Sequence, residues 1–274
     1  MERNKSIDSV AGLMITYMVF THICQHYGYE KSSVYMALEH ILYFFMPWFF
    51  FKAGMFFKIG DNKTVLKKSF DRLIRPFILY SLIGHICYCG ICYLQGDFHL
   101  ATLVPYYCLL MQGSIPGNLP LWFLLTLFFS RIAFNVVMNK GCSPYWIAAV
   151  SLLLAFVLHV VNFKQPFYLA NTMTGVFFMS IGYLYAKRAK ITPPILLAYL
   201  LVYLMSQSFP SFVGMRSNHL YYGFYLLWIM YSVSGIVLIN FLARKFLNNT
   251  KILSFLGTYS MEIYCLHWIP LLFI

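Results

Sequence analysis

The sequence has few charged residues, and acidic side chains are the scarcest of them. Only 10% of its 274 residues are charged, with 8 acidic against 20 basic side chains, whereas 61% are hydrophobic. A soluble domain carries about 25% charged residues. A globule of this size cannot hide so much apolar surface, and a disordered chain has the opposite composition. The composition therefore excludes both a soluble enzyme and a disordered protein.

The sequence also lacks internal repeats, low-complexity segments and a second Cys-x-x-Cys pair beside Cys89 and Cys92. Most of its cysteines lie in or beside apolar runs, where cysteine packs as a small hydrophobe, so no disulfide framework is predicted. His22 and His26 have the spacing of a metal-binding pair, but Ile23 stands where the zincin motif has Glu. No metal site is predicted.

The sequence contains nine long apolar runs. A helix needs about 20 residues to cross the hydrocarbon core, and continuous rather than alternating runs favour helices over strands. The sequence predicts an all-α, polytopic integral membrane helix bundle with about nine spanning helices, forming a single domain over residues 1–274. The runs are Val10–Tyr27, Val34–Phe57, Leu73–Leu94, Leu119–Met138, Tyr145–Val161, Phe167–Ala186, Pro194–Phe209, Leu220–Leu242 and Ile252–Ile274.

A shorter apolar stretch, Leu100–Met111, lies between the third and fourth runs. Two Gly and two Pro follow it within residues 113–120, and such a cluster breaks a helix. We expect this stretch to be a re-entrant segment or to lie on the outer surface. If this stretch were counted as a span, every later loop would lie on the opposite side of the membrane.

The distribution of basic residues predicts the orientation. With the N-terminus inside, 15 of the 20 basic residues fall in cytoplasmic segments, and only Lys31, Lys164 and Arg216 fall in outer ones. This bias follows the positive-inside rule. The net charge of +12 is therefore read as a topology signal, and no nucleic-acid partner is expected.

Histidines stand inside the predicted spans, where polar groups are costly and are usually functional. His22 comes 14 residues after Asp8, which places it about 21 Å along its helix. His267 comes 15 residues after Ile252, about 22 Å along the last helix. His159 is expected at a similar height, so three imidazoles are expected in the outer third of the bundle. The other interpretation of each one is a hydrogen bond between helices.

Two carboxylates accompany these histidines. Glu262 is expected near the membrane midplane, where a buried carboxylate needs a partner or a proton. Glu39 and its neighbour His40 enter the second predicted helix from the outer side.

Arg72-Leu73-Ile74-Arg75-Pro76 is predicted to open the third helix at the cytoplasmic face. Two Arg three residues apart share a helix face, and the guanidinium fork suits phosphate. Pro76 fits a helix start, whose N-terminus adds backbone donors for an anion. The other interpretation is a plain topology signal. A phosphate site with histidines about 15–20 Å deeper suits a long donor with a charged head, such as an acyl-CoA.

Five blocks spread over nearly the whole chain: Arg3…Ile7-Asp8 with His22, Phe49–Gly54, Arg72–Pro76, Leu121–Leu124 and Ser260–His267. In this order they resemble the membrane acyltransferase 3 family. The resemblance implies an O-acyltransferase of a bacterial inner membrane. Such an enzyme moves an acyl group, often acetyl from acetyl-CoA, onto a hydroxyl of a surface polysaccharide or a lipid-linked sugar. The acyl-CoA is a substrate, and no bound cofactor is implied.

The resemblance also implies roles for individual residues. His22 matches the essential histidine of the first helix, acting as general base or as a transient acyl carrier. Arg72 and Arg75 match the paired arginines of donor binding. Many members have an Arg eleven residues before the histidine, where this chain has Ala11. Either Lys52 is expected to supply that cation, or the donor chemistry differs. The family has one more helix after the last block, which this chain is expected to lack.

Supporting residues complete the prediction. His267, Glu262 and Asp8 are expected to orient or recharge the catalytic histidine. Asn118 and Trp122 are expected to form the acceptor rim, because aromatic faces suit sugars. The expected partners are acyl-CoA, a carbohydrate or lipid-linked glycan acceptor, and membrane lipid. The alternative function is a polytopic exporter of a polysaccharide or small polar solute, with His and Glu relaying protons. The lack of an inverted repeat argues against it.

Overall fold

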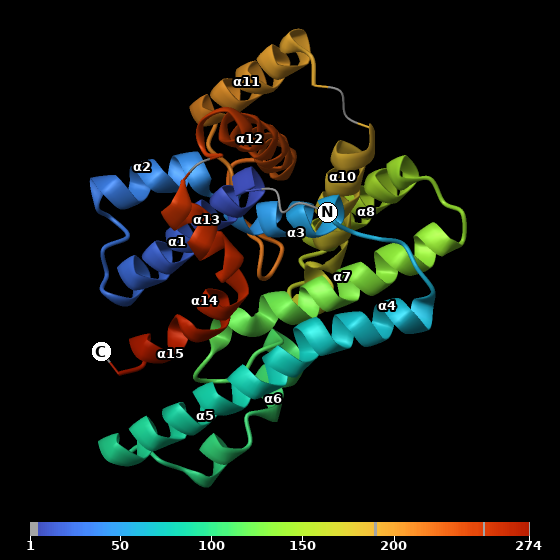
Figure 1. The fold of residues 1–274 in the computed structure, drawn as a ribbon. Helices are drawn as coiled ribbons and strands as arrows, with labels where there is room; N and C mark the ends of the chain where they lie inside the picture. The colour runs from blue at the N-terminus through green and yellow to red at the C-terminus, as the bar shows by residue number, and fades with distance from the viewer. Residues whose placement is uncertain (1–4, 189–190, 249, 274) are drawn as a thin grey trace. The chain divides into compact units, whose positions relative to one another are not determined.

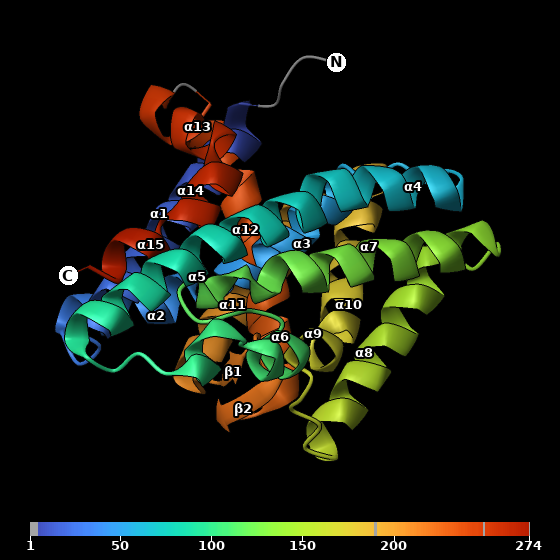
Figure 2. The ribbon, with the colours of Figure 1, turned by 90° about the horizontal axis from the view of Figure 1, so that it is seen from below.

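A computed structural model describes residues 5–188, 191–248 and 250–273, which form helices joined by short loops (Figure 1) and one two-stranded hairpin (Figure 2). The chain divides into two compact units, and each is described by itself. Unit 1 comprises Met1–Phe49, Lys190–Val213 and Leu220–Tyr264, and unit 2 comprises Phe50–Ala189, Gly214–His219 and Cys265–Ile274.

Unit 1 is built around α1, which packs along α13 (Figure 1). A Cβ on Gly12 would overlap the carbonyl oxygen of Leu253, and one on Gly257 would overlap that of Asp8, so two glycines allow this approach. The elements of unit 1 are α1 (Lys5–His26), α2 (Ser33–Leu42), the start of α3 (Phe45–Met55), α11 (Pro193–Ser208), most of β1 (Phe212–Gly214) and β2 (His219–Tyr222), α12 (Tyr225–Phe246), α13 (Lys251–Thr258) and most of α14 (Ser260–Leu266).

In unit 2, α7 packs against both α4 and α10, and α10 packs against α8 (Figure 2). The crossing of α3 with α10 is close at Gly54 and Gly182, where an added Cβ would overlap the backbone of the other helix. The elements of unit 2 are the rest of α3, α4 (Asn62–Ser69), the π-helical turn η1 (Phe70–Ile74), α5 (Arg75–Gln95), η2 (Leu100–Leu103), α6 (Tyr106–Gln112), η3 (Leu119–Leu121), α7 (Trp122–Asn139), α8 (Pro144–Val160), α9 (Phe167–Ala170), α10 (Thr172–Arg188) and α15 (Trp268–Leu271).

The predicted fold class is confirmed: the chain is a polytopic membrane protein of helices. Each of the nine apolar runs is largely helical in its described residues. Five helical segments are long and apolar enough to cross a membrane: Lys5–His26, Ser33–Met55, Asn62–Gln95, Leu119–Asn139 and Tyr225–Phe246. The shorter helices α8 and α11 are also apolar. The stretch Leu100–Met111 forms η2 and α6, and α6 ends at Gly113, whose φ is +64°.

Prolines divide two of the runs that were predicted as single helices. The second run is interrupted between α2 and α3, because Pro47 has no N–H to donate to the carbonyl of Tyr43. The last run is three short helices rather than one. Pro270 removes the corresponding bond to the carbonyl of Leu266, where α14 ends. The height expected for His267 assumed an unbroken helix, and that premise was wrong.

The eighth run begins later than predicted. Residues from Leu220 to Tyr222 belong to strand β2, and α12 starts only at Tyr225. Gly223 lies between them with a φ of +80°, a left-handed conformation that ends the strand and cannot continue into a right-handed helix. The apolar and aromatic residues 220–222 suit a strand as well as a helix, which hydropathy alone does not distinguish.

Candidate functional site

Arg72 and Arg75 lie in and just after η1, within helical backbone that is continuous from α4 to α5. The prediction that they open a helix was therefore wrong, and no free helix N-terminus adds donors to this site. The backbone N–H of Arg75 bonds to the carbonyl of Phe70, which is π-helical spacing. The wider turn accommodates Pro76, which cannot donate a bond to the preceding turn.

The side chains around η1 form a cluster of three arginines in unit 2. Arg75 is exposed and makes an ion pair with Asp71 at 3.1 Å. Arg72 is exposed one turn earlier on the same helix. The third member, Arg131, comes from α7 and is half-buried, and its charge is close enough to be repelled by that of Arg72.

Two contacts fix the position of Arg131. Its Nε donates to the Oγ of Ser69 at 3.2 Å, and its guanidinium carbon lies 5.0 Å from the ring centroid of Phe57. Both neighbours are buried. Arg131 was not among the site residues predicted from the sequence. The available signal was a lone cation inside the apolar run Leu119–Met138.

The other predicted residues of unit 2 lie on separate elements. Lys52 is half-buried in α3, and His267 directly precedes α15, beside the ring of Trp268. Asn118 is fully buried, and its Nδ2 donates to the carbonyl of Cys265 at 2.9 Å. Trp122 begins α7 and is 8% exposed. The contact of Asn118 fixes the loop before η3 to the end of α14.

His22 is half-buried in α1 of unit 1, on the helix face that it shares with Gln25. The Nε2 of Gln25 donates to the hydroxyl of Tyr35 at 3.3 Å. This bond connects the helix of the predicted catalytic histidine to α2. The supporting carboxylates lie elsewhere in this unit: Asp8 is buried in the first turn of α1, and Glu262 is exposed in α14.

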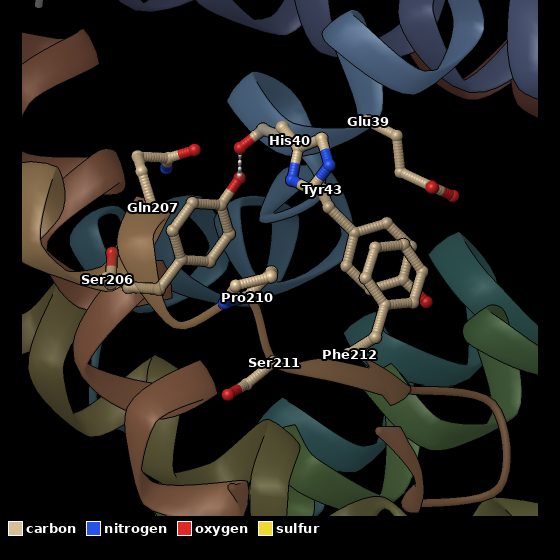
Figure 3. Close-up of a pocket in the computed structure, with 9 residues that line it drawn as sticks. Glu39, His40, Tyr43, Ser206, Gln207, Pro210, Ser211 and Phe212 are labelled. Carbon is tan, nitrogen blue, oxygen red and sulfur yellow. Dashed lines mark hydrogen bonds between the residues drawn. The ribbon is translucent and has the colours of Figure 1, made fainter. Parts of the chain in front are cut away.

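A polar pocket adjoins this part of α2 (Figure 3). The ring of Phe212 stacks on that of Tyr43 with 3.4 Å between centroids. The hydroxyl of Tyr231 donates to the carbonyl of His40 at 2.8 Å. The pocket therefore combines an aromatic stack with carboxylate, imidazole, amide and hydroxyl groups. It is lined by Glu39, His40, Tyr43, Ser206, Gln207, Pro210, Ser211, Phe212 and Tyr231.

Two titratable groups of the hairpin lie outside the spans. Burial lowers the pKa of His219, and the nearby positive charges of Lys164 and His159 lower it further. Burial raises the pKa of Tyr222, and the negative charge of Glu39 adds to this effect. His219 therefore favours its neutral form.

Within the described residues, no group of three or more His, Cys, Asp or Glu is arranged to hold a metal ion. Comparison of the chain with known proteins gives one informative result. Residues 4–274 match the family described as the acyltransferase domain, acyltransferase 3. Comparison with curated proteins and with solved structures gives no match.

Proposed function

Because this chain belongs to the acyltransferase 3 family of membrane O-acyltransferases, we propose that it transfers an acetyl group from acetyl-CoA to a hydroxyl of a surface polysaccharide or lipid-linked sugar. The observation that carries the proposal is the family match over residues 4–274, which includes the helix with His22 and the turn with Arg72 and Arg75. Family membership favours this enzyme over the exporter.

His22 is the catalytic residue of the proposal. A neutral imidazole accepts the proton of the acceptor hydroxyl while that oxygen attacks the thioester carbon. The C–S bond then breaks, and CoA leaves as the thiol after taking up a proton. In the second route the imidazole itself carries the acyl group for one step. Asp8, Glu262 and His267 are the proposed supporting residues.

The donor is held by its phosphates in this proposal. Arg72 and Arg75 are exposed on adjoining positions of one helix, where guanidinium groups bind phosphate oxygens in pairs. Lys52, half-buried in α3, is the further cation proposed for the donor. All three residues lie in unit 2, whose contribution to the reaction is therefore donor binding.

The polar pocket of unit 1 is the proposed acceptor pocket. Its cavity of about 20 Å³ has room for one hydroxyl or hydroxymethyl group, so we propose that the sugar ring itself lies at the mouth of the pocket. Glu39 and Gln207 line the pocket and offer hydrogen bonds to that group, and the ring of Phe212, stacked on that of Tyr43, forms part of the wall. Asn118 and Trp122, in unit 2, remain residues proposed to contact the acceptor. We propose that both units work as one domain in a bacterial inner membrane, with the N-terminus cytoplasmic.

Reconstituted protein with labelled acetyl-CoA tests this proposal. We expect the label to reach a glycan acceptor added on the side opposite the donor, and to stay with CoA when the acceptor is omitted. Transport of unmodified glycan without transfer of label would contradict the proposal and support the exporter. Transfer from succinyl-CoA but not from acetyl-CoA would contradict only the assignment of acetyl as the acyl group, and would leave the proposed acyl transfer in place.

A further inference from the structure

The arginine cluster of unit 2 is not balanced by acidic side chains. In the described part of the chain, its one ion pair with a carboxylate joins Arg75 to Asp71. Arg72 and Arg131 have no acidic partner among the described residues, and their charges repel each other. Two guanidinium groups that lie near each other are therefore left without a counter-ion.

The position of Arg131 makes this imbalance significant. It lies within the candidate span Leu119–Asn139, about 12 Å along the helix from Asn139. A charge inside a span is costly, and such residues pair with an opposite charge or mark a ligand path. The Ser69 hydroxyl and the Phe57 ring hold the guanidinium in place but supply no negative charge.

The terminal nitrogens of the Arg131 guanidinium are not used by the contacts that hold it in place. Nε is occupied by Ser69, whereas the two terminal nitrogens make no hydrogen bond to any described residue. These atoms are also not among the fully buried polar atoms that lack a partner, so part of their surface is open. Terminal guanidinium nitrogens are the donors that bind phosphate in a bidentate manner.

We propose that Arg131 and Arg72 together bind a phosphate group of the acyl-CoA donor, with Arg131 as a binding residue of the donor site. This assignment rests on the proposed function and refines it. The effective pair for the phosphate is Arg72 with Arg131, from α7, rather than Arg72 with Arg75. Asp71 neutralises Arg75 and leaves it a weaker phosphate ligand. The bound anion removes the repulsion between Arg72 and Arg131.

The test compares three single variants that each remove one positive charge. Arg131→Gln acts on the proposed site, Arg75→Gln on the arginine that is already paired, and Lys140→Gln on an exposed cation at the end of the same helix. Binding of CoA, of 3′-dephospho-CoA and of pantetheine, which has no phosphate, is measured by calorimetry on each purified protein in detergent.

We expect Arg131→Gln to weaken CoA binding about 10- to 100-fold, the range for losing hydrogen bonds to a charged group. Arg75→Gln should weaken it less, and Lys140→Gln should leave it unchanged. Pantetheine should bind Arg131→Gln as it binds the wild type. Equal CoA affinity of Arg131→Gln and wild type would overturn the proposal, and so would an equal loss of affinity for pantetheine.

The melting temperature with and without CoA gives an independent readout. Arg131→Gln loses the bond to Ser69 and the contact with the Phe57 ring, so its ligand-free form should melt below the wild type. The same concentration of CoA should raise the melting temperature of the wild type and of Lys140→Gln more than that of Arg131→Gln, whereas an equal rise in all three would contradict the proposal. Arg131→Lys, which keeps the charge but loses the fork, should fold and show an intermediate affinity for CoA; wild-type affinity in this variant would contradict bidentate binding.

A further probe separates this inference from the proposed function. If the wild type fails to bind CoA but binds pyrophosphate through Arg131, the anion site stands and the donor assignment fails. If the wild type transfers acetyl from acetyl-CoA and Arg131→Gln binds CoA normally, the proposed function stands and the role of Arg131 fails.

Discussion

The indole Nε1 of Trp48 donates a hydrogen bond to the Oδ1 of Asn240 at 3.1 Å, and both side chains are fully buried in unit 1. The bond joins α3 to α12 inside an otherwise apolar core. Polar bonds between membrane helices are individually modest but leave a buried donor unpaired when one partner is removed. This pair therefore anchors the start of α3, just after the interruption before Pro47.

Replacing Asn240 with Ala should destabilise the protein by about 1 kcal/mol, since the Trp48 N–H loses its acceptor in a dry core. Thermal unfolding in detergent measures the change. In a double-mutant cycle with Trp48→Phe, the loss from both substitutions should be smaller than the sum of the two single losses. Strictly additive losses would show that the two side chains do not interact.

Gly12→Ala should destabilise unit 1 by about 1–3 kcal/mol, because the new methyl group meets the backbone carbonyl of Leu253 on α13. Gly90→Ala in α5 is the matched control, since an added Cβ there has open space around it. That control should keep or raise stability, by up to about 1 kcal/mol from helix propensity. Equal melting temperatures for Gly12→Ala and the wild type would contradict the close packing of α1 on α13.

Acidification should reveal the lowered pKa of His219. The unfolded chain binds a proton at a higher pH than the folded one, so stability should fall as the pH drops through and below about 6.5, the ordinary histidine pKa. His219→Gln should weaken this pH dependence of the melting temperature. His99→Gln, at an exposed site, should leave it unchanged. An identical pH profile for His219→Gln and wild type would rule out a contribution from His219.

Phe212→Ala should raise the KM for the acceptor several-fold and leave the KM for acetyl-CoA unchanged, because it removes one ring of the stack with Tyr43 in the proposed acceptor pocket. Initial rates with each substrate varied in turn measure the two constants. Phe209→Ala is the control, since this exposed ring lies outside the pocket lining. A rise in the KM for acetyl-CoA alone would show that the pocket binds the donor rather than the acceptor, and would contradict the proposal.

Hydropathy predicted much of the fold because the positions of long apolar runs depend on composition alone. It could not predict the interruption at Pro47 or the strand before Gly223, where single residues decide the backbone. Pro76 suggested a helix start at Arg72–Pro76, but the helix continues through this segment, because a π-helical turn accommodates the proline.

The candidate site was predictable only in part. Arg72 and Arg75 stand out in the sequence by their spacing, whereas the third arginine is 56 residues further on in Arg131. Its link to Ser69 and Phe57 depends on how α7 packs against α4 and η1. The proposed acceptor pocket likewise brings α2 together with residues 206–212 and α12. Contacts between distant segments carry no local sequence signal.

The central claim is that His22 catalyses acyl transfer from acyl-CoA, and the rate of label transfer from acetyl-CoA by His22→Ala tests it most directly. His26→Ala, one helical turn further along α1, is the matched control. We predict that His22→Ala, folded and with wild-type affinity for CoA, transfers label about 10²–10⁴-fold more slowly than the wild type, while His26→Ala transfers at a normal rate. Transfer by His22→Ala at the wild-type rate would contradict the account.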